Sequence, residues 1–211
     1  MTSILQTPVA FVSLILASSS PFRKELLNKL GLEFSTHSPD IDESRKVNET
    51  PEQLVYRLAQ SKAREVAKYH DGLIIASDQV ATLQDGLGMN DQVLGKPHSH
   101  ENAIKQLSQC SGKTVTFVTS LCLLNTNSDN IQTIVETFKV VFRDLSAQQI
   151  DNYLKKEQPY NCAGSFKSEG LGISLFSSLE GNDPNTLIGL PLIKLIQLLE
   201  NEGIDILSTG A

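Results

Sequence analysis

The stretch LILASSSPFRKELL, Leu14–Leu27, places hydroxyls and cations where an apolar run meets an expected helix. Three serines end the run, and Pro21 is the kind of residue that starts a helix. Backbone N–H groups and the dipole at a helix N-terminus favour an anion, and Arg23 adds a guanidinium that holds phosphate oxygens in pairs. The stretch therefore indicates a phosphate site, although it lacks the GxxxxGK[ST] spacing of a P-loop. The alternative is a plain helix cap followed by a solvated face.

Carboxylates occur in two further segments. Ser77-Asp78-Gln79 follows a buried apolar run, so we expect it at the C-terminal end of a strand, where open α/β sheets bind ligands. A carboxylate there can hold Mg²⁺ or accept a proton from water, and the alternative is an ordinary turn residue. A second carboxylate from the polar segment 38–53 would complete a Mg²⁺ site, unless that segment is a solvated charge run. Its candidates are Asp40, Asp42 and Glu43.

Two lysines are candidates for further phosphate contacts. Lys62 lies on an expected helix, and Lys96 lies in Gly95-Lys96-Pro97, where its neighbours fix the backbone. Either can equally be an ordinary surface charge, as most lysines are. The histidines show no catalytic or metal-binding pattern. The three cysteines, Cys110, Cys122 and Cys162, are odd in number and include no CxxC pair, which predicts reduced thiols, no disulfide framework and no zinc site.

Length and charge limit the class of protein. A chain of 211 residues with 40% hydrophobic and 20% charged residues has an ordinary globular composition and can bury a full core. The net charge of −6 argues against general nucleic-acid or anionic-membrane binding, which needs a surplus of lysine and arginine. The apolar run 8–17 is too short to span a bilayer and no cation precedes it, so we expect a buried strand and a cytoplasmic protein.

Apolar periodicity interleaves helices and strands along the chain. Helices are expected from Ser19 or Ser20 to Gly31, from Thr50-Pro51, over 99–109, over 146–157 and in a last segment that ends near Gly203. Strands are expected over 12–17, 33–37, 73–76, 114–124 and 131–142, with a hairpin turn at Asp85-Gly86 and Gly-rich strands in 162–180. The long antiparallel pair predicts an α/β fold with a mixed, twisted sheet and flanking helices. We expect one domain over 1–211, with 1–11 as an N-terminal extension.

The order of the motifs is more specific than any one of them. Along the chain come SxSPxRxxLL, the acidic loop, RLAxxKA, SDQ, GKP, SEGLG and GLPL. This succession resembles the Maf family of nucleotide pyrophosphatases from Leu14 to about Leu199. Within that family, Ser77-Asp78-Gln79 and CAGSFKSEG at 162–170 most resemble the 7-methyl-GTP pyrophosphatase subgroup.

The resemblance implies a mixed α/β fold with two lobes around a cleft. It also implies hydrolysis of a nucleoside triphosphate to a monophosphate and pyrophosphate with a divalent cation, Mg²⁺ or Mn²⁺, and it is compatible with a homodimer. Asp78 falls on the catalytic acid position, where it would orient or deprotonate the attacking water, and with Glu43 it would hold the metal. The phosphate-binding positions are Ser18, Arg23, Lys62 and Lys96.

The same resemblance implies that Phe22, Gln79 and Glu169 determine base specificity. A 7-methylguanine ring is cationic, so an aromatic face binds it more strongly than it binds a neutral base, by roughly 0.5–2 kcal/mol. A carboxylate can accept hydrogen bonds from the N–H groups of the base. The dTTP/UTP subgroup instead tends to have Arg, Thr and Gln at these three positions, whereas the 7-methyl-GTP subgroup also has Trp at the first. Taken alone, Phe22 would be a packing residue and Glu169 a surface charge. The alternative functions are a dTTP/UTP pyrophosphatase and a nucleotide-binding regulator of cell division without turnover.

Overall fold

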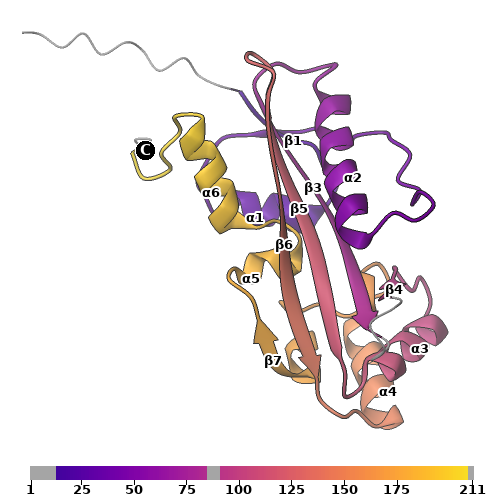
Figure 1. Cartoon of the computed structure of the whole chain (residues 1–211). Helices are drawn as coiled ribbons and strands as arrows, with labels where there is room; N and C mark the ends of the chain where they lie inside the picture. Colours follow the sequence, from indigo (N-terminus) through magenta and orange to yellow (C-terminus); the bar gives the residue numbers. More distant parts are fainter. Residues whose placement is uncertain (1–12, 85–90, 209–211) are drawn as a thin grey trace, which may run out of the picture.

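A mixed β-sheet forms the centre of the protein in the computed structural model, which describes residues 13–84 and 91–208 (Figure 1). Within these residues the sheet has seven strands in the order β2-β1-β3-β5-β6-β7, with β4 paired to β3. β1 is parallel to β2 and β3, and the other pairs are antiparallel. The strands are β1 Leu14–Leu16, β2 Ser35–Thr36, β3 Leu73–Gln84, β4 Asp91–Leu94, β5 Thr114–Asn125, β6 Asn130–Phe142 and β7 Phe176–Glu180.

The three long strands β3, β5 and β6 run the length of the molecule and connect two groups of elements (Figure 1). β1, α1, α2 and α6 lie toward one end, and β4, α3 and α4 lie toward the other. The helices are α1 Pro21–Asn28, α2 Pro51–Val66, α3 His100–Cys110, α4 Ala147–Glu157, α5 Pro184–Ile188 and α6 Leu192–Asn201. None of the helices in the described part of the chain is both long and apolar enough to cross a bilayer.

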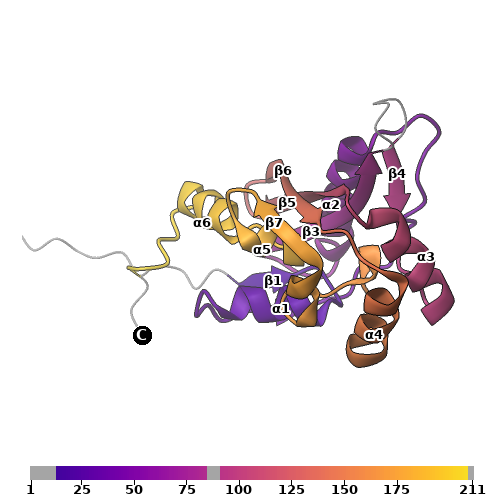
Figure 2. The same ribbon diagram turned by 90° about the horizontal axis from the view of Figure 1, so that it is seen from below.

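Helices cover both faces of the sheet, which Figure 2 shows from below, and alternate side chains of the central strands pack against them. Ile15, Ile74 and Cys122 pack with Ala59 and Ala63 of α2 on one face. The intervening residues face the other layer, which α1 and α6 provide: Leu16, Ile75 and Leu121 pack with Leu27 and Leu195. This period of two places α2 and α1 on opposite sides of β3.

Side-chain caps begin several helices at the predicted residues. Ser20 accepts the backbone N–H of Arg23, with Pro21 in the first turn of α1. Thr50 and Ser146 each form a reciprocal capping box with a glutamine three residues later. The predicted starts of α1, α2 and α4 are therefore confirmed.

The predicted strand end at Ser77-Asp78-Gln79 is wrong. β3 continues to Gln84, because β5 pairs with it antiparallel from Leu73 to Leu83. The parallel neighbour β1 ends here, because its last residue, Leu16, lies opposite Ile75. On the same flank, β4 pairs with β3 only from Ala81 onward, and its last residue, Leu94, lies opposite Ala81. In the described structure, residues 76–80 thus lack a strand partner on this flank.

The Gly-rich strands expected in 162–180 are mostly wrong as well. Only β7 is a strand there, and it is preceded by two 3₁₀ turns at Ala163–Ser165 and Leu171–Leu175. Gly164 has φ +74°, a left-handed conformation that interrupts an extended chain. The short helix α5, capped by Asp183, was not predicted. The pairing of β3 with β4 confirms the hairpin, whereas its Asp85-Gly86 turn lies outside the described residues.

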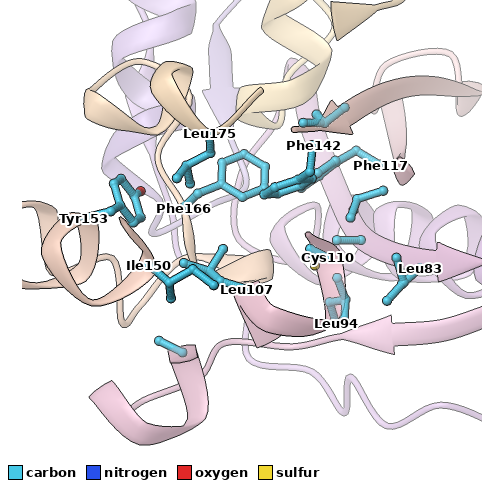
Figure 3. Packing of buried hydrophobic residues seen from close by; sticks show 14 of the residues in the cluster. Leu83, Leu94, Leu107, Cys110, Phe117, Phe142, Ile150, Tyr153, Phe166 and Leu175 are labelled. Carbon is cyan, nitrogen blue, oxygen red and sulfur yellow. The ribbon is translucent and has the colours of Figure 1, made fainter. Parts of the chain in front are cut away.

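An aromatic cluster forms the core beneath the second group of elements (Figure 3). The ring of Phe166 makes edge-to-face contacts with Phe117, Phe142 and Phe176 at centroid distances of 5.5, 5.7 and 4.9 Å. Leu107 of α3 belongs to the same cluster and is fully buried. Packing of this kind fixes α3 and α4 against the sheet.

Replacing Leu107 with Ala should destabilise the protein by about 2–5 kcal/mol, because the substitution leaves a cavity in this cluster. The matched control is Ile193→Ala on α6, whose side chain is 48% exposed and should change stability by only about 0.5 kcal/mol. Urea denaturation measures both. Equal denaturation midpoints for the two variants would contradict this account of the core.

Candidate active site

A cleft of about 720 Å³ opens beside the unpaired flank of β3, between the two groups of elements. Its volume is in the range of small-molecule binding sites. Every residue that the family resemblance assigned to the site lines it, although those residues are spread along the chain from Ser18 to Glu169. They are Ser18, Phe22, Arg23, Glu43, Lys62, Asp78, Gln79, Lys96 and Glu169. The roles assigned to them stay predictions. Of the three candidates in the acidic loop only Glu43 lines the cleft, and Asp40 and Asp42 do not.

Lys62 lies between two carboxylates at the floor of the cleft. Its Nζ is 2.6 Å from Asp78 Oδ1 and 2.8 Å from Glu43 Oε1. The side chains of Lys62 and Asp78 are only 8% and 9% exposed, whereas that of Glu43 is 58% exposed. Burial raises the pKa of Asp78 above its ordinary value, although Lys62 and Arg23 act in the opposite direction. A raised pKa makes a carboxylate a better proton acceptor once it is ionised.

Ser120 on β5 fixes the backbone at Asp78. Its Oγ accepts the N–H of Asp78 at 3.2 Å and donates to the carbonyl of Val55 on α2 at 2.6 Å. One buried hydroxyl thus joins the strand of Asp78 to the helix of Lys62. Sequence reasoning missed this residue, and the available signal was the adjacent polar pair Thr119-Ser120 in the middle of a strand rich in apolar residues.

Arg23 is held by the turn that joins α5 to α6. Its Nε donates to the carbonyl of Gly189 at 2.8 Å, and the same oxygen accepts the hydroxyl of Ser77 at 2.8 Å. Gly189 has φ +120°, and a Cβ added there would lie 3.4 Å from Arg23 Nε. Anchoring at Nε leaves the two terminal nitrogens of the guanidinium for an oxyanion. Burial lowers the pKa of Arg23, and the nearby Asp78 and Glu43 oppose that shift.

The serine turn before α1 uses part of its hydrogen-bonding capacity internally. Ser18 Oγ accepts the N–H of Ser20 at 3.1 Å, and Ser20 Oγ accepts the N–H of Arg23 at 3.4 Å. Ser20 is therefore the helix cap that the alternative interpretation required. The turn still lines the cleft through Ser18, Ser19 and Ser20. The cap and the anion site occupy the same turn and do not exclude each other.

Gln79 is oriented by the chain that follows β7. Its Nε2 lies 2.8 Å from Thr119 Oγ1 and 2.8 and 3.2 Å from the carbonyls of Thr186 and Leu187. The amide nitrogen is thus committed to α5. Since no protein donor in the described structure is bonded to Oε1, this oxygen can accept a hydrogen bond from a ligand.

The opposite wall of the cleft carries Lys96 and Glu169, both exposed. The backbone around Lys96 is tied down, because Gly95 and Pro97 accept side-chain amides of α3 and the N–H of His98 donates to Tyr160. Lys167 lines the same wall, with its Nζ 3.5 Å from Glu157 Oε1, and was not assigned a role from sequence.

The side chains that line the cleft supply only part of the ligand set of a divalent cation. No cluster of three or more His, Cys, Asp or Glu side chains with metal-site geometry occurs within 13–84 and 91–208. Glu43 and Asp78 supply two carboxylates whose near oxygens both contact Lys62 Nζ, which brings these groups within reach of one small cation. Mg²⁺ is commonly held by one or two carboxylates, with water and substrate phosphates as its other ligands. The residues therefore fit such an ion if a phosphate ligand accompanies it.

The three cysteines are free and differ in accessibility. Cys110 and Cys122 are fully buried, and burial raises the pKa of their thiols to about 12 and about 11. Cys162 is half-buried and lines the cleft, and burial raises its pKa as well.

Brief iodoacetamide treatment of the folded protein should modify Cys162 first, and faster as the pH rises, because the thiolate is the reactive form. Mass spectrometry of tryptic peptides measures the modification, and Cys162→Ser is the control that should remove the early signal. Early modification of Cys110 or Cys122 in the native protein would contradict the burial described here.

Known proteins are similar to this chain over most of its length. Residues 13–202 match the family of Maf-like proteins. A 7-methyl-GTP pyrophosphatase of Nitrosococcus oceani is 57% identical over 196 residues, which cover 92% of this chain and 96% of that protein. The 7-methyl-GTP pyrophosphatase of Vibrio cholerae is 52% identical over 194 residues, which cover 92% and 97%.

Solved structures show the same fold at low sequence identity. The Ham1 protein of Staphylococcus aureus aligns with a TM-score of 0.52 at 16% identity, covering 90% of this chain and 99% of that one. A HAM1 protein from Coxiella burnetii aligns with a TM-score of 0.50 at 14% identity and the same coverage. The resemblance seen in the order of the motifs is thus confirmed over the chain from residue 13 to residue 202, and the protein belongs to the Maf family.

Proposed function

We propose that this protein is a cytoplasmic nucleoside triphosphate pyrophosphatase that hydrolyses 7-methyl-GTP to the monophosphate and pyrophosphate. Its role would be to remove modified nucleotides before RNA synthesis uses them. The observation that carries the proposal is the meeting of Arg23, Lys62 and Lys96 with the buried carboxylate of Asp78 in one cleft. The names of the relatives with 52–57% identity support the choice of substrate. The homodimer implied by the family stays a prediction.

The cationic side chains of the cleft are assigned to binding the phosphate groups of the substrate. Arg23, whose Nε is anchored on Gly189, presents its terminal nitrogens to phosphate oxygens in a fixed orientation. The turn before α1 adds Ser18 and backbone N–H groups, and Lys96 approaches from the opposite wall. Charge builds up on the leaving pyrophosphate as its bond to the α-phosphorus breaks, so cations placed there stabilise the transition state.

Asp78 is the proton acceptor in this proposal. Its Oδ1 is bonded to Lys62, and its other oxygen can orient a water in line with the α-phosphorus. Burial raises the pKa of Asp78, whereas the neighbouring Lys62 lowers it by favouring the ionised carboxylate. A divalent cation held by Glu43 and Asp78 would, when bound, supply charge neutralisation at the phosphates.

Base selection is assigned to Phe22, Gln79 and Glu169, all of which line the cleft. The ring of Phe22 offers a face for a cationic base, and the free amide oxygen of Gln79 and the carboxylate of Glu169 offer acceptors for guanine N–H groups. Because an arginine at position 22 would repel a cationic base, this set favours 7-methylguanine over a pyrimidine.

Asp78→Asn should reduce turnover of 7-methyl-GTP by about 10²–10⁴-fold while the fold is retained, since the substitution removes the base but keeps its shape. Chromatography of the reaction products measures monophosphate and pyrophosphate, and circular dichroism monitors the fold. Activity close to that of the wild type would disprove the role of Asp78. Release of inorganic phosphate instead of pyrophosphate would overturn the proposed reaction.

Phe22→Arg should lower the selectivity for 7-methyl-GTP over GTP by roughly 2–30-fold in kcat/KM, which corresponds to the loss of a cation–π contact. Phe22→Trp is the matched control and should keep or increase that selectivity. Rates with 7-methyl-GTP, GTP, UTP and dTTP measure the effect. A wild-type preference for UTP or dTTP would retain the chemistry and refute this account of the base site, and binding without turnover would favour the regulator.

A further inference from the structure

Glu43 contributes to the cleft from a segment without helix or strand. Between β2, which ends at Thr36, and α2, which begins at Pro51, the described chain has no regular secondary structure. The side chain of Glu43 is 58% exposed, yet its Oε1 lies 2.8 Å from the buried Lys62. An exposed side chain on an irregular loop loses much conformational freedom when it is held in one place. Some other contact must therefore hold the backbone at Glu43.

Glu49 is the internal anchor of this loop. It is 8% exposed, although its neighbours Asn48 and Thr50 are exposed. Its carboxylate forms a two-point ion pair with Arg57 of α2, with Oε1 2.6 Å from Nε and Oε2 2.9 Å from Nη2. Oε2 also accepts the backbone N–H of Lys46 at 2.9 Å. Side-by-side pairing of this kind fixes orientation as well as distance.

The same ion pair reaches the residue next to Glu43. Nη2 of Arg57 donates to the carbonyl of Ser44 at 3.0 Å, and the N–H of Ser44 donates to Asp42 Oδ1 at 2.9 Å. A further bond joins Arg45 Nε to the carbonyl of Glu49 at 2.8 Å. The backbone on the C-terminal side of Glu43 is thus attached to α2 through Arg57.

Helix α2 consequently holds the loop at two points. Arg57 binds the backbone beside Glu43, and Lys62, five residues further along the same helix, binds the carboxylate of Glu43 itself. Isolated surface ion pairs contribute little to stability, but this pair is bidentate and its carboxylate is shielded from solvent. The hydrogen bond from Arg57 lowers the pKa of Glu49 to about 2, so the pair is ionised at neutral pH.

We propose that Glu49 and Arg57 are positioning residues that hold Glu43 at the cleft, where the proposed function uses its carboxylate. Neither residue lines the cleft, so their effect on the reaction passes through Glu43. The inference rests on the proposed function only for the consequence in catalysis. The ordering of the loop can be measured without substrate or metal.

The first test is hydrogen–deuterium exchange of the metal-free protein. Arg57→Lys keeps the charge and removes the two-point geometry, and Glu49→Gln keeps the shape and removes the charge. Both should increase early exchange in residues 42–49, while exchange in residues 58–66 of α2 stays as in the wild type. The matched control is Arg64→Lys on the same helix, whose guanidinium is 57% exposed and lies 4.0 Å from Asp129. Unchanged exchange in residues 42–49 for both variants would overturn the proposal.

The second test is a double-mutant cycle measured as activity against Mg²⁺ concentration. Arg57→Lys should raise the half-activating concentration by roughly tenfold or more, which is typical of partners that orient a ligand. In a Glu43→Gln background the same substitution should have no further effect, because residues that act through one group are not additive. Additive effects would overturn the positioning role. A Glu43→Gln variant with wild-type Mg²⁺ dependence would instead refute the assigned role of Glu43, and the exchange experiment would still decide whether the loop is held.

Discussion

The ion pairs of Lys62 are the interaction on which the rest of the site depends. An ammonium that is 8% exposed is costly unless carboxylates accompany it, and here Asp78 and Glu43 do so from a strand and a loop. The packing of α2 on the sheet sets where the ammonium lies, and Ser120 fixes the backbone of Asp78 relative to that helix. Three elements distant in sequence are therefore brought together by one buried charge.

The sheet places this charge where a ligand can reach it. Both β1 and β4 end short of Asp78, with their last residues opposite Ile75 and Ala81. The flank of β3 at Asp78 is therefore open, while its other flank is paired with β5. At Asp78 the strand is thus hydrogen-bonded to β5 along one edge and accessible to a ligand along the other. This arrangement suits catalysis, because reactive groups on strands are held more precisely than groups on loops.

Features that depend on neighbouring residues could be predicted from the sequence, whereas features that depend on distant residues could not. Ser20 and Thr50 were identified as caps because a cap depends on residues three positions away. The continuation of β3 past Asp78 was not predicted, because it depends on pairing with β5, some 40 residues later in the chain. The candidate site residues were identified from residue types, their neighbours and the order of the motifs, whereas the roles of Ser120 and Glu49 depend on partners in another element of the fold. A buried hydroxyl or carboxylate is recognised only when its long-range partner is known.

The proposed reaction and the proposed base selectivity need different degrees of precision, and they are assigned to different sets of residues. Proton transfer and phosphate binding need reacting groups placed within a fraction of an ångström, and Asp78, Lys62 and Arg23 are each fixed by contacts to backbone or buried charge. In the proposed function, discrimination between bases needs only an aromatic face and an acceptor, roles that the proposal assigns to the half-buried Phe22 and the exposed Glu169. On this proposal, substitution at these two positions would change the preferred base without disturbing the ion pairs of Lys62. The same phosphate-binding and proton-accepting groups would then serve nucleotides with different bases.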